Sequence, residues 1–263
     1  MKKYITKNTL KSAKKQARSG SRKVQFRADA INLSSQAGAI PAIKFLDKMG
    51  FSKLIQDNVD HQRGESALFQ LNDALYMTLI AIIAGATALH HVPLIWADRL
   101  LQKVAGWFRI PVDTTLGRIF KSCTERHIAE LETFNHTMRK RVWRRASSDR
   151  GSVACQTQWI DVDSTVKTVF GFQEGAAKGY NPFKKGALSY HPLLAFSTST
   201  KEILQGWLRT GSAYTSNGIT EFMKQLLAQL SDKTHHIVRG DSGFFVGGLM
   251  DFLDEKSQGY LIK

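Results

Sequence analysis

The spacing of apolar residues changes near residue 150, and this change constrains the fold more than any other feature of the chain. Before it, apolar residues recur at the intervals of three and four that are typical of helices, as in residues 68–89. After it, apolar and polar residues alternate, as in residues 156–163. With 263 residues, of which 43% are hydrophobic, each half can bury a core. The pattern predicts an α/β protein: a helical N-terminal domain followed by a mixed sheet flanked by helices.

The first half is predicted to be entirely helical. Short helices are expected at residues 41–49 and 51–59, on either side of Gly50, and a long buried helix at residues 68–89. Another helix follows Pro93, and a further one runs from Asp113 or Thr114 to Val142. Two of these helices joined by a turn could form a helix-turn-helix that reads DNA, but a bundle that packs only on itself is the preferred interpretation.

The second half is predicted to alternate strands and helices. Residues 156–163 and 166–172 are expected to pair as a hairpin, followed by a glycine-punctuated loop at residues 171–186 and a third strand at residues 190–198. The remaining elements are a helix, a strand, a second helix and a last strand, expected at residues 219–230, 236–240, 244–254 and from Gly259. A change in composition at residues 146–151 marks the boundary, which gives an arm, a helical domain and a sheet domain at residues 1–30, 31–150 and 151–263.

The positive charge of the chain is concentrated in two segments. The formal net charge is +15, and residues 1–30 carry ten basic side chains against one acid, Asp29. Residues 139–150 carry six basic side chains against Asp149. In the arm, such local basicity favours contacts with DNA phosphates over a solvated tail. For residues 139–150, phosphate contact and the exposed end of a helix are equal alternatives. The predicted DNA-binding residues in these segments are Lys11, Lys14, Lys15, Arg18, Arg141, Arg144 and Arg145.

No targeting or membrane segment is expected. The basic N-terminus lacks the apolar core of a secretory signal. The longest apolar stretch, residues 74–89, is shorter than the ~18 residues of a membrane span. Cys123 and Cys155 have no zinc-ligand spacing. We therefore expect a cytoplasmic protein, associated with a bacterial nucleoid and not with a membrane.

Two aspartates are candidates for metal-dependent chemistry. Alternation puts Asp161 and Asp163 on the same face of one strand, where their charges repel unless a cation lies nearby. Asp241 directly follows a buried strand, and the carboxyl ends of such strands are where open α/β sheets bind ligands. If the two strands are neighbours, Asp163 and Asp241 can share Mg²⁺. The alternative for each acid is a turn or helix-cap residue.

Three segments carry a resemblance to a known family: residues 160–165 (IDVDST), residues 170–196 and residues 239–245 (RGDSGFF). With the final GYLIK they resemble the catalytic region of DDE-superfamily insertion-sequence transposases, closely after residue 150 and loosely before it. The resemblance implies an RNase H-like core that cleaves and transfers DNA strands with Mg²⁺ or Mn²⁺. It puts the two catalytic and metal-binding aspartates on Asp163 and Asp241, with Asp161 as the alternative to Asp163.

The resemblance is incomplete at the C-terminal end. Family members need a third acid, a glutamate on a later helix, and Glu255 precedes the last predicted strand, so it is a poor substitute. Because nothing follows Lys263, we expect an incomplete sheet, weak metal binding and little cleavage. The expected partner is double-stranded DNA, at transposon terminal repeats and at the target, bound by a homodimer on paired ends. Two alternatives are a non-catalytic remnant that binds transposon ends or interferes with an intact transposase, and an RNase H-like nuclease unrelated to mobile DNA.

A second predicted DNA contact lies in the loop at residues 173–185. It offers Lys178, Lys184 and Lys185 with Tyr180 and Phe183 interleaved, which suits a phosphate contact beside a stacked base. A glycine-rich loop without a ligand is the alternative. His191 could approach the acids, but a core histidine bonded to a backbone carbonyl is the preferred interpretation.

Overall fold

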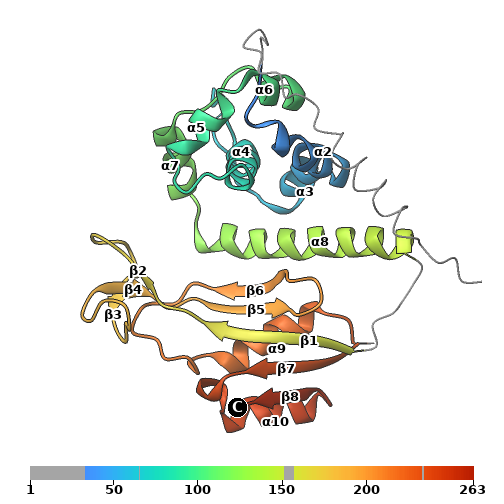
Figure 1. Ribbon diagram of the computed structural model, residues 1–263, viewed down its shortest axis with the longest axis vertical. Coiled ribbons are helices and arrows are strands. Elements are labelled where there is room, and N and C mark those ends of the chain that lie inside the picture. Colours follow the sequence, from blue (N-terminus) through green and yellow to red (C-terminus); the bar gives the residue numbers. More distant parts are fainter. Residues whose placement is uncertain (1–32, 65, 151–156, 233) are drawn as a thin grey trace, which may run out of the picture. The chain divides into compact units, whose positions relative to one another are not determined.

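The computed structural model describes residues 33–64, 66–150, 157–232 and 234–263, without the side chains of residues 147–150 (Figure 1). The chain divides into two compact units, Met1–Met138 and Arg139–Lys263, each with its own apolar core. The predicted basic arm lies outside the described residues. Among the helices that are described, none is both long and apolar enough to cross a membrane.

The described part of the first unit consists of helices, as the sequence predicts. They are η1 (Ala37–Ala39), α2 (Ile40–Met49), α3 (Phe51–Asn58), α4 (Leu71–Ile83), α5 (His91–Trp96), α6 (Arg99–Ala105), α7 (Asp113–Lys121) and the first half of α8 (Glu125–Arg150). Gly50 separates α2 from α3 because its φ of 67° is a conformation that other residues rarely adopt. Leu101 of α6 and Leu116 of α7 are both fully buried in the core of this unit, as a self-packing bundle requires.

Two helix predictions in this unit are wrong. The helix predicted at residues 68–89 spans only Leu71–Ile83, because Gln70 and Asp73 form a capping box at its start and Gly85 adopts a φ of 101° after its end. The helix predicted from residue 113 or 114 to 142 is interrupted. α7 ends at Lys121, and α8 starts at Glu125 after a turn in which His127 Nδ1 accepts a hydrogen bond from the Thr124 amide at 2.9 Å.

The second unit is built on a five-stranded mixed sheet of order β6-β5-β1-β7-β8. Its strands are β1 (Thr157–Ser164), β5 (Leu193–Ser197), β6 (Ile203–Trp207), β7 (His235–Gly240) and β8 (Gly259–Ile262). β1, β5 and β6 are antiparallel neighbours, whereas β1, β7 and β8 run parallel. Helices α9 (Ile219–Gln229) and α10 (Gly247–Glu255) pack on one face, where Ile160 and Val162 of β1 are buried with Phe222. The predicted α/β class is confirmed.

A small second sheet, of order β2-β4-β3, extends from the first. It comprises β2 (Lys167–Thr168), β3 (Ala177–Lys178) and β4 (Leu188–Tyr190) (Figure 1). The predicted hairpin between residues 156–163 and 166–172 is therefore wrong, because β1 pairs with β5 and β2 pairs with β4.

The predicted strand at residues 190–198 is divided between the two sheets. It breaks at His191 and Pro192, into β4 and β5, since proline has no amide hydrogen to continue a ladder. In chain order the third strand of the main sheet is β6, which the sequence analysis did not predict. The helix predicted at residues 244–254 begins only at Gly247, after the short η2 (Ser242–Phe244).

Candidate functional site

The main sheet brings Asp163 and Asp241 to the same edge. β1 and β7 pair in parallel, with Asp161 opposite Arg239, so the same register continued by two residues sets Asp163 opposite Asp241. Both lie at the carboxyl ends of neighbouring strands, and the backbones of hydrogen-bonded strands are about 4.8 Å apart. Asp241 keeps an extended backbone, and both aspartates are exposed. The two strands are thus neighbours, which is the condition under which the sequence analysis expects the two acids to share a cation.

Each of these carboxylates is held at one oxygen and open at the other. Oδ1 of Asp163 accepts a hydrogen bond from the Ser164 amide at 2.7 Å, and Oδ1 of Asp241 accepts one from the Gly243 amide at 2.9 Å. Within the described part of the chain, Oδ2 of each has no hydrogen-bond partner, and neither residue forms an ion pair. Asp241 thus does cap a short helix, and it still presents a free carboxylate oxygen.

Asp161 differs from Asp163 although both lie on the same face of β1. Its Oδ1 accepts a hydrogen bond from Arg239 Nε at 2.7 Å, and its Oδ2 accepts one from Thr198 Oγ1 at 2.8 Å. Burial acts to raise the pKa of Asp161, but the hydrogen bonds from Arg239 and Thr198, with the charges of Arg239 and Lys201, outweigh it and lower the pKa below its ordinary value. Asp161 is already neutralised, which favours Asp163 as the metal ligand on this strand.

Polar side chains surround the residue that follows Asp163. Ser164 Oγ lies 3.1 Å from His191 Nε2 and 3.3 Å from Thr215 Oγ1. His191 is buried, and its Nδ1 lies 2.6 Å from the carbonyl oxygen of Ala213. The interpretation of His191 as a core histidine bonded to a carbonyl is confirmed, and its other nitrogen reaches the neighbour of a candidate metal ligand.

Arg209 holds the loop that carries Thr215. Its Nε donates to the carbonyl oxygen of His191 at 3.0 Å. Its Nη1 donates to three more carbonyl oxygens at 2.8–3.1 Å, those of Tyr214, Thr215 and Asn217. Burial lowers the pKa of Arg209. Sequence reasoning missed both Arg209 and Thr215, because their neighbours are set by the fold and no local pattern distinguishes them from surface residues.

The chemistry of the two open carboxylates fits a hard divalent cation. Mg²⁺ is commonly bound through one or two carboxylates together with waters and phosphate oxygens. Asp163 and Asp241 provide that number of carboxylates without a competing counter-ion among the residues described. No cluster of three or more His, Cys, Asp or Glu side chains able to hold a metal occurs in the described ranges. A cation here would therefore take its remaining ligands from water, DNA or a further acid.

The predicted DNA-binding lysines of the second unit lie on and beside the small sheet. Lys178, Lys184 and Lys185 are all exposed. Tyr180 and Phe183 are exposed as well, at 75% and 80% of their surface. Lys184 Nζ lies 5.3 Å from the centre of the Phe170 ring, close enough for a cation–π contact. The small sheet thus presents cations and aromatic rings together.

The second basic segment, in α8, has two kinds of arginine. Arg139 is buried, and its Nη2 donates to the carbonyl oxygens of Ile203 and Leu204 in β6 at 3.1 and 2.6 Å. Arg144 and Arg145 are exposed and Arg141 is half-buried. Arg139 therefore does not contribute to a phosphate-binding surface. Lys11, Lys14, Lys15 and Arg18 lie outside the described residues.

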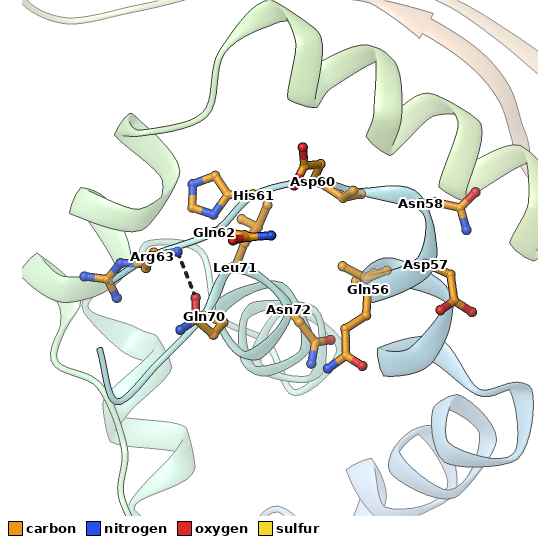
Figure 2. A pocket seen from close by; sticks show the side chains of 12 residues that line it. Gln56, Asp57, Asn58, Asp60, His61, Gln62, Arg63, Gln70, Leu71 and Asn72 are labelled. Atoms are coloured by element: carbon orange, nitrogen blue, oxygen red, sulfur yellow. Dashed lines mark hydrogen bonds between the residues drawn. The ribbon is translucent and has the colours of Figure 1, made fainter. Parts of the chain in front are cut away.

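A polar pocket in the first unit is a second candidate site. Figure 2 shows its lining along the segment that follows α3 and at the start of α4, where the Arg63 amide donates to Gln70 Oε1 at 3.3 Å. The lining carries both acids and bases, including Asp57, Asp60 and Arg63. The lining has two aspartates against one arginine, and this small imbalance does not mark it for a charged ligand.

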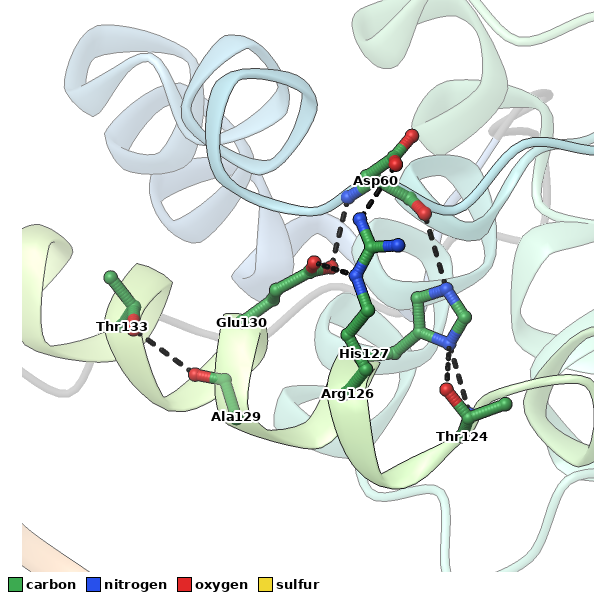
Figure 3. Close-up of polar contacts among 7 residues, drawn as sticks. All are labelled: Asp60, Thr124, Arg126, His127, Ala129, Glu130 and Thr133. Carbon is green, nitrogen blue, oxygen red and sulfur yellow. Dashed lines mark hydrogen bonds and ion pairs between the residues drawn. The ribbon is translucent and has the colours of Figure 1, made fainter.

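The charged groups beside this pocket already bond one another. Arg126 forms ion pairs with Asp60 at 2.6 Å and with Glu130 at 2.8 Å (Figure 3). His127 Nε2 lies 3.1 Å from the Asp60 carbonyl oxygen, and its Nδ1 caps α8 at Thr124. These bonds fasten the segment to the helix, so they explain the cluster as structure. The open acids of the second unit are the stronger candidate site.

Comparison with known proteins identifies the family. A family model described as transposase DDE domain group 1 matches residues 16–263. The chain belongs to the DDE transposase family. Membership implies phosphoryl transfer on DNA as the activity, and DDE transposases use divalent metals. A search of the curated proteins gives no match.

Solved transposase complexes match over most of the chain. The Mos1 transposase paired-end complex with left transposon end has a TM-score of 0.30 and 10% identity, over 99% of this chain and 68% of that one. The piggyBac transposase synaptic complex with hairpin DNA has a TM-score of 0.36 and 12% identity, over 96% of this chain and 46% of that one. These scores are too low to bear on the fold or the site of this DDE transposase.

Proposed function

We propose that this chain serves the transposition of an insertion sequence, by metal-dependent cleavage and transfer of DNA strands at Asp163 and Asp241. The observation that carries the proposal is the pair of unneutralised carboxylates at neighbouring strand ends, in a member of the DDE transposase family. Mg²⁺ is the proposed ion, and Mn²⁺ has the same preference for oxygen ligands. Asp161 is not proposed as a ligand, because Arg239 and Thr198 occupy its oxygens.

The chain's own groups would orient the reaction. A bound divalent cation would supply charge stabilisation for an in-line displacement, in which an oxygen of water or of a DNA 3′-hydroxyl forms a bond to phosphorus while the bond from phosphorus to one ester oxygen of the DNA strand breaks. The Ser164 amide fixes Oδ1 of Asp163, and the Gly243 amide fixes Oδ1 of Asp241, so both Oδ2 atoms remain for coordination. No covalent intermediate with the protein is needed.

The resemblance to insertion-sequence transposases implies a third acid, and the described residues bring no third carboxylate beside these two. We therefore propose that this chain by itself binds the cation weakly and cleaves DNA poorly. Robust nicking by the purified chain, abolished by Asp241→Ala, would contradict this part of the proposal.

The proposed partner is double-stranded DNA, at the terminal repeats and at the target site, within a bacterial nucleoid. Transposition joins two ends, so a homodimer on paired ends is the proposed assembly. The exposed groups of the small sheet suit phosphate contact beside a stacked base. The proposed contacts are Lys178, Lys184 and Lys185 of the small sheet, Arg141, Arg144 and Arg145 of α8, and Lys11, Lys14, Lys15 and Arg18 of the arm.

A metal titration tests the site directly. Binding of Mn²⁺ to the full chain can be followed through the electron paramagnetic resonance signal of the free ion. Asp163→Asn and Asp241→Asn should each abolish specific binding, while Asp254→Asn, an exposed acid of α10, should leave it unchanged. Equal affinity in the unaltered chain and both site variants would refute the assignment. Salt-dependent binding to transposon ends without any metal-dependent cleavage would instead support the non-catalytic DNA binder.

A further inference from the structure

The loop between β6 and α9 touches both of the candidate metal-binding strand ends. Thr215 Oγ1 lies 3.3 Å from Ser164 Oγ, and Ser164 is the residue whose amide holds Asp163. The methyl group of Thr215 packs on Gly243, where a Cβ atom would lie 2.9 Å from Thr215 Cγ2. Gly243 is the residue whose amide holds Asp241. The Thr215 side chain thus contacts both Ser164 and Gly243, the residues whose amides hold the two acids. The loop that carries Thr215 contains neither acid.

This loop is fixed by bonds to its backbone. Arg209, two residues after β6, donates to the carbonyl oxygens of Tyr214, Thr215 and Asn217. The Tyr214 amide in turn donates to Asn217 Oδ1 at 3.0 Å. Nε of Arg209 also donates to the His191 carbonyl oxygen, and the His191 ring reaches back to Ser164. The loop, the link between β4 and β5 and the end of β1 are therefore connected through this one guanidinium and one imidazole.

The hydroxyl and the methyl group of Thr215 make different contacts. Its hydroxyl lies within hydrogen-bond distance of Ser164 Oγ, and its methyl group packs on Gly243. Because Gly243 has no side chain, the threonine approaches the backbone that donates to Asp241. Serine at position 215 would keep the hydroxyl and lose the methyl contact, while valine would do the opposite. Each substitution therefore removes one of the two contacts and keeps the other.

We propose that Thr215, held by Arg209, is a positioning residue that sets the spacing of Asp163 and Asp241 for a shared divalent cation. The proposal rests on the proposed function of the two acids. It assigns to the loop a role beyond closing the chain between β6 and α9. Groups that orient metal ligands typically change metal affinity by about 10- to 100-fold when they are removed.

Mn²⁺ binding by matched variants of the full chain tests the proposal. Thr215→Val and Thr215→Ser should each weaken binding about tenfold, and Arg209→Lys should weaken it as well, because a lysine cannot donate to all of these carbonyl oxygens. Thr200→Val is the control, since Thr200 is an exposed residue in the turn between β5 and β6. Thermal unfolding of each variant, measured in parallel, separates loss of position from loss of fold.

The possible outcomes distinguish the two proposals. A variant that melts like the unaltered chain but binds Mn²⁺ about tenfold more weakly supports the positioning role. If both Thr215 variants bind Mn²⁺ within twofold of the unaltered chain while Asp163→Asn abolishes binding, the positioning role is refuted and the metal site stands. If Asp163→Asn has no effect, the proposed function itself fails.

Discussion

Replacement of Arg209 by methionine removes four hydrogen bonds, three to the loop at residues 214–217 and one to His191 between β4 and β5. Nη1 has two hydrogens for three acceptors, so at most three of the four bonds reach full strength. Two of the acceptors, the carbonyl oxygens of Tyr214 and Asn217, are exposed, and water can replace the guanidinium there. The bonds to His191 and Thr215 are partly buried and each contributes about 1.5–3 kcal/mol.

The expected loss is about 2–4 kcal/mol, after allowance for the desolvation that the guanidinium no longer suffers. The chain has two units, so a single unfolding transition is not assured. Amide hydrogen exchange of peptides from the loop measures the loss locally, with the helices of the first unit as an internal reference. The exchange rate in the loop should rise about 30- to 1,000-fold.

Arg144→Met is the matched control for this experiment. Its guanidinium is exposed, and among the described residues its one hydrogen bond is a long contact to the Lys140 carbonyl oxygen at 3.4 Å, so a loss below about 0.5 kcal/mol is expected. Exchange in the loop of Arg209→Met within a factor of two of the unaltered chain would show that these carbonyl groups do not depend on Arg209.

Three further predictions concern pH, packing and DNA binding. Burial, with the charge of His127, lowers the pKa of His61 below 6.5, so the unfolded chain takes up the proton first. The first unit should therefore lose stability as the pH falls below about 6.5, and His61→Gln should flatten this dependence in thermal unfolding scans; equal slopes would contradict it. Gly240→Ala should destabilise the second unit by about 1–3 kcal/mol in urea unfolding, because the new Cβ would lie 2.9 Å from Phe244 Cδ2; no loss would mean that Phe244 moves freely. Arg144→Glu should reduce the salt dependence of DNA binding by about one unit of log–log slope, and an unchanged slope would exclude this arginine from the contact.

The positions of the acids on their strands could be predicted from the sequence because the alternation of side chains along a strand is a local property. Alternation along β1 fixes which residues share a face, and the apolar run of β7 fixes where Asp241 begins. Their approach to one another follows from the parallel pairing of β1 with β7. Which strands pair could not be predicted from the sequence. β1 pairs with β5 although the strands of the small sheet lie between them in the sequence, and β6 has only a short alternating pattern.

The supports of the site could not be predicted, because they depend on contacts between segments distant in sequence. Thr215 meets Ser164 across 51 residues, and Arg209 meets His191 across 18. The burial of Arg139 depends on such contacts as well. Local charge does not distinguish this arginine from the others of residues 139–150, whereas the fold buries it against β6.

The burial of Arg139 has a consequence for the solubility of the sheet. β6 is an outer strand, and the unpaired carbonyl groups of an outer strand can recruit strands from other molecules. Arg139 donates to two backbone carbonyl groups of this strand, those of Ile203 and Leu204, and is itself buried against it. Its replacement would remove both bonds from the rim at which pairing with a foreign strand would begin.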